Sequence, residues 1–427
     1  MKQIYINNDK YQDMTTLNEI CKKAQEASYE TASATTEQKN NILKLAAKLI
    51  IENQDKILIA NKDDIAAAKE KKLSSAMIDR LALNHDRINA ISAAILAIMD
   101  LADPVGKVIW ENDRPNGLKI KRVTVPLGLL AVIYESRPNV TADAFALCLK
   151  SGNAVILKPG SESFATSKII FQLLQQAVEE GGLPKYAISI VPDNSREMVD
   201  QLLTMDQYID VVVPRGGKNL IKKVASTSKI PVFKHLDGNC HIYIHESADL
   251  ELAKNVLFNA KLRRPGICGA TESVVIDEKL LPQANKIFDD LNEAGCEIRG
   301  DKQICSNLDY AILADDTDYG KEYLDKIISV KIVNNSESAI NHINKYGSSH
   351  TDCIIATNEN DINKFLQKID SAIVMVNSST QFADGGEFGL GAEIGIATGK
   401  LHARGPVGLD QLVTYKYHVI GNGQIRK

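Results

Sequence analysis

Residues 129–157, LLAVIYESRPNVTADAFALCLKSGNAVIL, decide the fold class of this 427-residue chain. An apolar run that ends at Tyr134 and another at 154–157 flank a helix-length stretch at 142–150. The same alternation of helix-length stretches and β-rich runs continues at 162–180, 187–191, 196–204 and 209–213. Such an alternation is typical of a parallel sheet with helices on both faces, so we expect an α/β fold.

A second set of β-rich runs, again separated by helix-length stretches, follows at 240–245, 273–276, 328–333, 353–356 and 372–376. Two such sets predict two doubly wound α/β lobes, because a chain of this length exceeds what one hydrophobic core usually serves. The Pro- and Gly-bounded crossing from Pro231 to Gly238 suggests a boundary near residue 235. We therefore expect domains over 1–235 and 236–380, with 381–427 returning to the first. The first hundred residues show helical apolar spacing, which predicts a helical layer.

Two extended segments stand outside this rhythm. Residues 118–125 and 412–420 both alternate apolar and polar side chains, as half-buried strands do. We expect these segments to pair into a small β arm that serves a homo-oligomer.

Composition excludes several classes of protein. A formal net charge of -4 gives no basic field of the kind that nucleic-acid-binding proteins use, so we expect no nucleic-acid partner. The longest apolar stretch, 90–102, is shorter than the about 20 residues that cross a bilayer, and residues 1–10 lack the apolar core of a signal peptide. We expect no membrane association and a cytoplasmic location. The seven cysteines are scattered without a CxxC pair, which predicts neither disulfides nor a metal site.

One cysteine has a distinctive context. The run RRPGICGATE, 263–272, places Cys268 in a loop after a helix-like segment and before a strand. The neighbouring arginines, Arg263 and Arg264, favour the nucleophilic thiolate, and the flanking glycines permit close approach of a substrate to the backbone. For the other six cysteines a buried structural role is the better interpretation. We expect Cys268 to be the nucleophile.

Asn139 lies in the RPN turn at the carboxyl end of the first predicted strand. This edge is where open α/β sheets bind ligands. An amide there can donate to a developing oxyanion, yet an asparagine before a helix is also an ordinary N-cap. The pattern leaves these two alternatives open.

Two strand-to-helix turns offer anion sites. The segment LKPGSES, 157–163, places Lys158 at a strand end beside the amino terminus of a helix, and VPRGGKN, 213–219, repeats the design with Gly216 and Gly217. Helix amino termini bind phosphates because their N–H groups and dipole favour negative charge. Nucleotide phosphates would fit both turns, although Gly-rich turns of this kind are common.

Taken in order, the motifs PLG, RPN, SGNAVILKPGSES, the Gly-rich turn, HLDG and RRPGICGATE resemble those of the aldehyde dehydrogenase superfamily. The variants ESRPNVT, HLDGNCHIY, DYGKEYLD, GSSHTDCII and ADGGEFGLGAEIGIATGKLHARGPVGL are similar to those of the branch that reduces L-glutamyl 5-phosphate. The likeness extends from about residue 100 through the remainder of the sequence.

The resemblance implies an aldehyde dehydrogenase-like fold, with a cofactor-binding domain at 1–235 and a catalytic domain at 236–380. It also implies the NADPH-dependent reduction of L-glutamyl 5-phosphate to glutamate 5-semialdehyde and phosphate, the second step of proline biosynthesis. The glutamate 5-kinase that makes the labile substrate is a candidate protein partner.

The same resemblance assigns roles to individual residues. Cys268 matches the nucleophile and Asn139 the oxyanion donor. Lys158 matches the lysine that contacts the adenosine ribose, and Glu322 matches the glutamate that holds the nicotinamide ribose. Ligands for the phosphate or the substrate carboxylate are expected among Arg137, Arg264, His350 and Arg404, with a surface ion pair as the alternative for each arginine.

Two departures from the superfamily pattern bear on the reaction. Where hydrolytic members have ELGG, whose glutamate activates water, this sequence has HLDG with His235 in that place. Without that carboxylate, the thioester is better suited to exchange with phosphate than to hydrolysis. Ser161 stands where NAD-preferring relatives carry a glutamate that would repel a 2′-phosphate, which favours NADPH, although the adjacent Glu162 leaves the alternative open.

Two other functions are kept as alternatives. An ordinary aldehyde dehydrogenase would oxidise an aldehyde to the free acid with NAD(P), without any dependence on phosphate. A catalytically silent binding protein would not require the set of Cys268, Asn139, Lys158 and Glu322.

Overall fold

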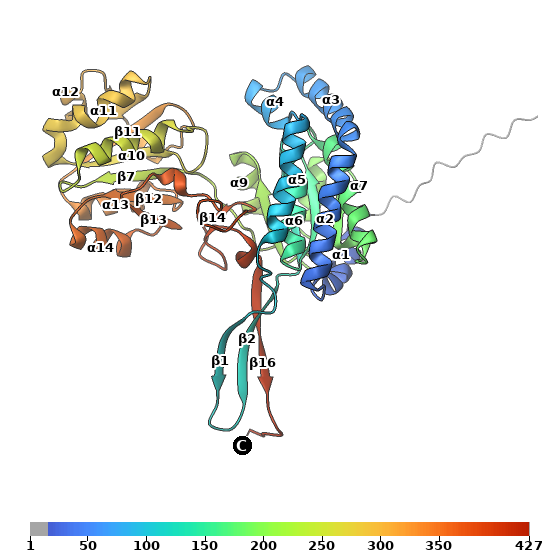
Figure 1. Ribbon diagram of the computed structural model, residues 1–427. Coiled ribbons are helices and arrows are strands. Elements are labelled where there is room, and N and C mark those ends of the chain that lie inside the picture. Colours follow the sequence, from blue (N-terminus) through green and yellow to red (C-terminus); the bar gives the residue numbers. More distant parts are fainter. Residues whose placement is uncertain (1–15, 427) are drawn as a thin grey trace, which may run out of the picture. The chain divides into compact units, whose positions relative to one another are not determined.

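The computed structural model describes residues 16–426 and divides into two compact units (Figure 1). Unit 1 comprises the chain up to Val232 and the stretch from Gly408 onward, and unit 2 comprises Phe233–Val407. The first crossing thus lies close to the predicted residue 235. The second crossing was predicted at residue 381, which is wrong, because residues 381–407 pack within unit 2. Gln381 Nε2, for example, donates to the Ala260 carbonyl at 2.9 Å.

The predicted amino-terminal layer consists of helices α1 (Leu17–Thr31), α2 (Thr36–Glu52), α3 (Gln54–Glu70), α4 (Ser75–Leu81) and α5 (His85–Asp100). Most of these helices begin after a polar residue whose side chain accepts a backbone N–H of the first turn, namely Thr16, Thr35, Ser74 and Asn84. Helices α2, α3 and α5 pack against the helices that cover the sheet of unit 1.

The sheet of unit 1 is parallel, with strand order β5-β4-β3-β6. Its strands are β3 (Leu129–Tyr134), β4 (Ala154–Pro159), β5 (Ile188–Ile190) and β6 (Val211–Arg215). Its helices are α6 (Val140–Lys150), α7 (Phe164–Glu180), α8 (Arg196–Leu202) and α9 (Lys218–Thr227). Every residue of β3 and β4 is buried, because α1, α8 and α9 cover one face and α6 and α7 the other.

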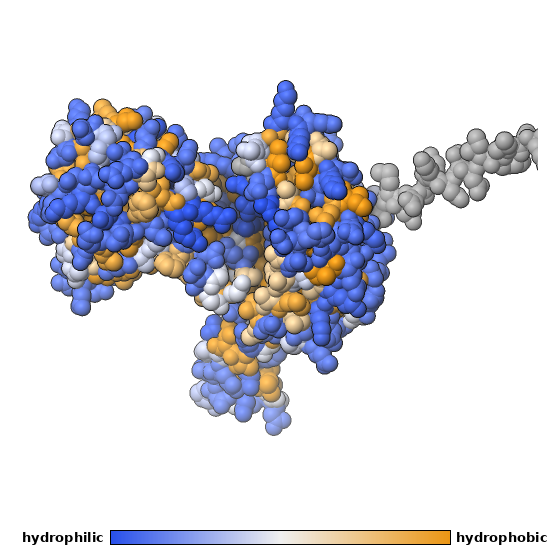
Figure 2. All heavy atoms as spheres, turned by 45° about the horizontal axis from the view of Figure 1, so that its top comes forward, coloured by the Kyte–Doolittle hydropathy of each residue, from blue (hydrophilic) through white to orange (hydrophobic). Residues whose placement is uncertain are grey.

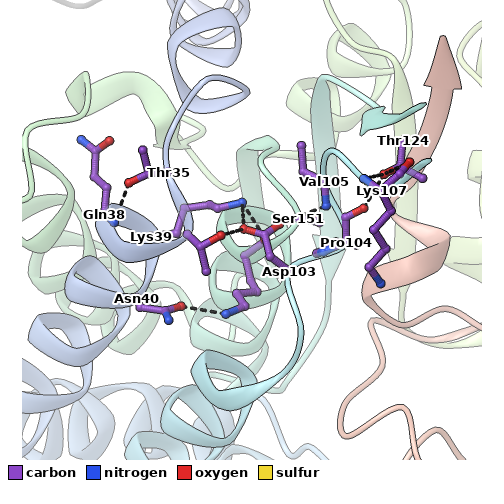
Figure 3. Close-up of polar contacts among 12 residues, drawn as sticks. Thr35, Gln38, Lys39, Asn40, Asp103, Pro104, Val105, Lys107, Thr124 and Ser151 are labelled. Atoms are coloured by element: carbon purple, nitrogen blue, oxygen red, sulfur yellow. Dashed lines mark hydrogen bonds and ion pairs between the residues drawn. The ribbon is translucent and has the colours of Figure 1, made fainter. Parts of the chain in front are cut away.

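A buried polar cluster ties α2 to the turn that leads into β4 (Figure 3). Lys39 Nζ lies 2.5 Å from Asp103 Oδ2, and Lys150 Nζ donates to Asn40 Oδ1 and the Met99 carbonyl, each at 2.7 Å. Both lysines are 1% exposed. Burial alone would raise the pKa of Asp103, but hydrogen bonds, the strongest from Lys39, outweigh it and lower that pKa. Burial lowers the pKa of Lys150.

The predicted arm is a three-stranded antiparallel sheet in unit 1, with order β1-β2-β16. The central strand β2 (Lys119–Pro126) pairs with β16 (Val413–Ile420) along the full length of both, so the predicted partnership is confirmed. The other neighbour of β2, β1 (Val108–Asp113), was not predicted.

One face of the arm carries aromatic side chains. The guanidinium of Arg122 lies over the rings of Trp110 and Tyr415, 5.1 and 5.2 Å from their centroids. Trp110 and Tyr417 are 37% and 57% exposed, and further apolar residues of the arm are exposed beside them (Figure 2). The arm therefore offers apolar surface that unit 1 itself does not cover.

Unit 2 contains a second parallel sheet, with order β10-β9-β11-β8-β7-β12-β13. The strands are β7 (Cys240–Ile244), β8 (Thr271–Asp277), β9 (Glu297–Gly300), β10 (Ile312–Leu313), β11 (Ile327–Val333), β12 (Thr351–Ile355) and β13 (Ile373–Val376). The helices are α10 (Leu250–Leu262), α11 (Ala284–Glu293), α12 (Lys302–Asn307), α13 (Ser336–Tyr346) and α14 (Glu359–Lys368). A short antiparallel pair, β14 (Ile396–Ala397) and β15 (Gly405–Pro406), completes it.

Two doubly wound α/β units with a small β arm confirm the predicted fold class. Among residues 16–426, none of the helices combines the length and the apolar character needed to cross a bilayer.

Candidate active site

Cys268 lies at the amino edge of the sheet in unit 2. Its loop connects α10 to β8, which pairs with β7, which in turn pairs with β12. His235 lies in the segment before β7, and His350 directly precedes β12. Because parallel neighbours start at the same edge, residues from three distant parts of the sequence meet. The ligand atoms of His235, Cys268 and His350 all lie within 4.8 Å of one another.

The backbone of Cys268 is held by the HLDG segment. A Cβ added to Gly238 would lie 2.6 Å from Cys268 Cα, so only glycine permits this approach. The thiol of Cys240 donates to the Cys268 carbonyl at 3.1 Å. On the other side of the loop, Thr380 Oγ1 donates to the Gly269 carbonyl at 2.7 Å. These contacts fix the nucleophile loop through its backbone.

The two imidazoles beside Cys268 are each oriented through Nδ1. His235 Nδ1 donates to the Ile396 carbonyl at 3.0 Å, and His350 Nδ1 lies 2.8 Å from Thr351 Oγ1. The rings are 5.5 Å apart and nearly perpendicular. Burial, and to a lesser extent the neighbouring His235, lowers the pKa of His350 to about 3. His350 is therefore neutral, and any contact with a phosphate would be a hydrogen bond rather than an ion pair.

Glu322 contacts the HLDG segment that packs on Cys268. Its Oε1 accepts a hydrogen bond from the Gly238 backbone N–H at 2.8 Å. The adjacent Asn239 donates through Nδ2 to the Tyr319 and Tyr346 carbonyls at 2.9 and 2.8 Å. The structure thus links the Glu322 loop to the segment that packs on Cys268.

A fully buried ion pair contacts the loop that carries Glu322. Lys261 Nζ lies 2.5 Å from Glu272 Oε2, and Glu272 Oε1 accepts from the Leu324 N–H at 3.2 Å. Burial raises the pKa of Glu272 to about 7, although the charge of Lys261 opposes this shift. The pair connects the end of α10, the start of β8 and the Glu322 loop.

The predicted anion ligands of unit 2 differ in their surroundings. Arg264 is exposed in the nucleophile loop. Arg404 forms an ion pair, because its Nη1 lies 2.8 Å from Asp370 Oδ1 and its Nη2 donates to the Asp370 carbonyl at 2.8 Å. This is the ion-pair alternative that the sequence left open for each arginine.

In unit 1, Asn139 and Arg137 lie in the turn after β3. Asn139 precedes α6, yet its side chain makes no capping hydrogen bond. Instead, Asn139 Nδ2 donates to Asp143 Oδ2 at 2.9 Å. Burial raises the pKa of Asp143 to about 6, against the opposing effects of the Asn139 hydrogen bond and the charge of Arg215. Asp143 therefore orients the Asn139 amide.

Lys158 lies near the carboxyl end of β4 and is buried. Its Nζ donates to the Pro159 and Asn194 carbonyls at 3.1 and 3.3 Å, and burial lowers its pKa. Ser161 Oγ donates to Glu162 Oε2 at 3.3 Å. The other Glu162 oxygen accepts from the N–H and the Oγ of Ser136, at 2.9 and 2.7 Å.

The amino terminus of α9 holds a carboxylate. Gly217 is its N-cap, and the Gly217 N–H donates to Glu135 Oε2 at 2.8 Å. A Cβ added to Gly216 would lie 2.9 Å from the Glu135 carboxyl carbon. Lys158 near the end of β4, and Asn139 and the Gly216–Gly217 turn just after β3 and β6, thus all lie at the carboxyl edge of one sheet.

Comparisons with known proteins point to one family. Residues 4–299 match the model of the aldehyde dehydrogenase family. The gamma-glutamyl phosphate reductase of Bartonella tribocorum is 50% identical over 405 residues, which cover 95% of this chain and 99% of that protein. The one from Clostridium botulinum is 46% identical, with 96% and 100% covered. The crystal structure of the Thermotoga maritima gamma-glutamyl phosphate reductase has a TM-score of 0.94 at 41% identity, covering 96% of this chain and 99% of that one.

The chain belongs to the gamma-glutamyl phosphate reductases of the aldehyde dehydrogenase family. It is thereby an oxidoreductase of a family that binds nicotinamide cofactors, and the resemblance read from the motifs is confirmed. An acetylating aldehyde dehydrogenase from Geobacillus thermoglucosidasius, with a TM-score of 0.65 at 18% identity, shares the fold. An engineered glycolyl-CoA reductase that shares it too, with a TM-score of 0.65 at 16% identity, was solved with bound NADP+.

Sequence reasoning missed several residues that surround the candidates. Asp143 lies one helical turn after Asn139, so helical spacing would have indicated the contact. Glu135 is brought to Gly217 because β3 and β6 are neighbours that end together. The contact between Gly238 and Cys268 and the grouping of the two histidines depend on strand order, and no local pattern predicts them.

Proposed function

We propose that this gamma-glutamyl phosphate reductase family member reduces L-glutamyl 5-phosphate to L-glutamate 5-semialdehyde and phosphate with NADPH, through a thioester on Cys268. The observation that carries the proposal is the surroundings of Cys268. Its backbone is clamped by Gly238, and the cluster around its thiol contains two imidazoles, with no carboxylate joining that cluster in residues 16–426.

The chemistry assigned to Cys268 begins with attack of its thiolate on the acyl carbon of the acyl phosphate. A carbon–sulfur bond forms, and the carbon–oxygen bond to phosphate breaks with its electron pair leaving on phosphate. The Asn139 amide and the Cys268 backbone N–H are assigned to the oxyanion. NADPH, when bound, supplies the hydride that reduces the thioester to the thiohemiacetal anion. Cleavage of the carbon–sulfur bond then releases the aldehyde and returns the electron pair to Cys268.

The residue at position 235 favours exchange with phosphate over hydrolysis. Hydrolytic aldehyde dehydrogenases use a glutamate there to activate water, and this chain has His235, hydrogen-bonded to the Ile396 carbonyl. Removing the carboxylate base leaves the thioester to be formed from, and cleaved by, phosphate.

The candidate cofactor residues fit a dinucleotide. The amino terminus of α9 already accepts the Glu135 carboxylate through Gly217, which indicates that it can accept an anion. Lys158 is positioned by two backbone carbonyls, and the carboxylates of Glu162, Asp193 and Glu135 lie close enough to act on its charge. We assign Lys158 and Ser161 to the adenosine ribose and its 2′-phosphate, Gly216 and Gly217 to the diphosphate, and Glu322 to the nicotinamide ribose. The preference for NADPH over NADH rests on Ser161, which places no carboxylate at that position.

One assay tests the proposal in the reverse direction. Reduction of NADP+ by the purified protein with glutamate 5-semialdehyde is followed with and without inorganic phosphate, and NAD+ is compared. We expect turnover to require phosphate and to favour NADP+. Equal rates without phosphate would instead identify an ordinary aldehyde dehydrogenase that forms the free acid.

The arm supports a homo-oligomer as a further part of the proposal. Its exposed aromatic face, with Trp110 and Tyr417, offers apolar surface to a second copy of the chain. Light scattering of the protein and of a Tyr417→Lys variant tests this, since the variant should dissociate if the face is an interface. We also propose a cytoplasmic location. Glutamate 5-kinase is proposed to deliver the substrate directly, and this is tested by measuring binding of the two purified proteins.

A further inference from the structure

The group of His235, Cys268 and His350 has a property that reduction of an acyl phosphate does not require. Its three ligand atoms lie within 4.8 Å of one another, and one thiol with two imidazoles is a donor set that borderline-soft cations prefer. Hard cations such as Mg²⁺ and Ca²⁺ prefer oxygen donors, which this cluster lacks in the described residues. The donor set of this cluster therefore matches thiophilic divalent metals better than hard cations.

The histidines are oriented as metal ligands usually are. His235 donates its Nδ1–H to the Ile396 carbonyl, so the lone pair in that tautomer is on Nε2. A backbone carbonyl that accepts from the other ring nitrogen is one of the usual supports for a ligating histidine. In His350, Nδ1 is engaged by Thr351 Oγ1 at 2.8 Å and by Cys240 Sγ at 3.6 Å. In the tautomer in which Nδ1 carries the proton, Nε2 is the ligand atom of each ring.

His350 provides a second, independent sign of a missing ligand. The residue is fully buried, and its Nε2 has no hydrogen-bond partner within the described residues. A buried polar atom without a partner costs free energy and calls for an explanation, such as an ion. A metal bound to Nε2 would supply the partner.

We infer that His235 Nε2, Cys268 Sγ and His350 Nε2 bind one Zn²⁺ ion, with water in the fourth position, and that this ion reversibly inhibits the enzyme. Tetrahedral zinc places its ligand atoms roughly 3.5 Å apart, so the three atoms must approach by about an ångström, which side-chain rotation supplies. Binding displaces the thiol proton, and the sulfur lone pair that would attack the acyl carbon becomes the Zn–S bond. The inhibition rests on the proposed function of Cys268, whereas the binding does not.

Cobalt(II) binding tests the site without reference to activity. Tag-free protein, treated with EDTA and then freed of it, is titrated with Co²⁺ and then with Zn²⁺ as competitor. We expect one Co²⁺ per chain, tetrahedral d–d bands and a thiolate-to-cobalt charge-transfer band, all displaced by one equivalent of Zn²⁺. Substoichiometric binding, or spectra without the thiolate band, would overturn the site.

Variants separate this site from other metal-binding groups. His235→Gln and His350→Gln should each weaken Co²⁺ binding at least tenfold, and Cys268→Ser should remove the charge-transfer band. His418→Gln, on the exposed face of β16, and Cys305→Ser, in α12, are matched controls that should change nothing. Because His350 is buried, circular dichroism must show that each variant is folded, and His235→Gln tests the site if His350→Gln is not. Full binding by folded His235→Gln or by Cys268→Ser would contradict the proposal.

Inhibition is then measured in the semialdehyde assay. One equivalent of Zn²⁺ should abolish turnover, and EDTA should restore it. Stoichiometric binding through the thiolate with unchanged turnover would leave the metal site intact and contradict the role of Cys268 as nucleophile. Inhibition that persists undiminished in His235→Gln would mean that zinc reacts with the thiol alone and would overturn the three-ligand site.

Discussion

Both units of the chain are parallel α/β sheets, yet their candidate sites lie at opposite edges. In unit 1, Asn139, Lys158 and the Gly216–Gly217 turn lie at the carboxyl ends of strands, at the edge where α6, α7 and α9 begin. In unit 2, Cys268 and His350 precede strands, at the edge where α10 and α13 end. The carboxyl edge of the unit 1 sheet favours anions through the N–H groups and dipoles of helix amino termini. The amino edge of the unit 2 sheet instead places helix carboxyl ends near the site, and these do not favour anions.

This difference shows that the two sites depend on different forces. The helix amino termini of unit 1 favour a bound anion at the candidate cofactor site. We therefore expect substitutions that change charge to have their largest effect on cofactor binding there. The nucleophile receives no such help from the ends of α10 and α13, and it is held by close backbone contacts such as that with Gly238. We therefore expect changes of volume to be most damaging in unit 2 and changes of charge to be most damaging in unit 1.

The largest effect is expected at the nucleophile itself. Cys268→Ser should lower kcat by about 10³-fold or more, because the hydroxyl is a far weaker nucleophile at neutral pH. Cys305→Ser, elsewhere in unit 2, is the control and should retain activity. The rates of both are measured in the semialdehyde assay, and substantial turnover by Cys268→Ser would show that the chemistry does not depend on this edge of the sheet.

A single added methyl group next to Cys268 tests whether close backbone contact positions the nucleophile. Gly238→Ala should lower kcat by about 10²-fold, because the added Cβ forces the Cys268 backbone to move and misaligns the thiol. Gly399→Ala, also in unit 2, is the control, since nothing lies within 4 Å of the added atom. Equal rates for the two variants would contradict the view that backbone contact positions the nucleophile.

The buried charges of unit 1 provide the next test. Lys39→Met should lower the free energy of unfolding at pH 7 by about 2 kcal/mol, less than for a fully buried pair because Asp103 is partly exposed. Lys48→Met, on the same helix, removes an exposed pair with Glu52 and should change stability by less than about 0.5 kcal/mol. Urea titrations measure both.

The pH dependence of that difference checks its electrostatic origin. The pKa of Asp103 is lowered in the folded protein, so the stability it contributes is complete above the unfolded value of about 3.9 and is lost as pH falls through the folded value. The gap between the wild-type protein and Lys39→Met should therefore be constant above about pH 5 and shrink below about pH 4. A gap that does not narrow in acid would indicate a packing effect.

The smallest effect concerns cofactor choice. Ser161→Glu should raise the KM for NADPH about tenfold and leave that for NADH nearly unchanged, because a carboxylate repels the 2′-phosphate. Ser161→Gln has the same size without the charge and should behave as the wild-type protein does. Initial rates with each cofactor measure this, and equal responses to both substitutions would show that the site in unit 1 is shaped by volume as well.

Much of the fold could be predicted from the sequence. The strands β3, β7 and β13 were located within one residue at their starts because they are buried apolar runs with polar borders. The strands β9 and β10 were missed, since they are short and β10 is exposed. The second crossing was misplaced because the segment after residue 380 has only short elements, so its buried apolar residues, such as Ala383 and Ile396, form no regular period that assigns it to unit 2.

Some residues of the candidate sites could be predicted from local sequence, whereas others are brought together only by the order of strands in the sheet. Lys158, Gly216 and Gly217 were recognised because a strand, a turn and a helix follow one another along the chain. The meeting of Cys268 with His235 and His350 was not recognised, since it requires that β8, β7 and β12 be neighbours, a fact of sheet order rather than of sequence order. For the same reason a search for metal-ligand spacing predicted no site there.

The insertion of unit 2 between the two parts of unit 1 has a consequence for folding. Unit 2 is continuous, whereas unit 1 is completed only after the chain returns at Gly408, when Asn153 Nδ2 donates to the Leu412 carbonyl at 2.8 Å and β16 joins β2. Contacts of such long sequence separation form slowly, because a large loop must close first. During synthesis unit 2, which carries Cys268, can thus reach its native state before β16 completes unit 1. Pulse-labelling hydrogen exchange during refolding should show protection of β7 and β8 ahead of β2.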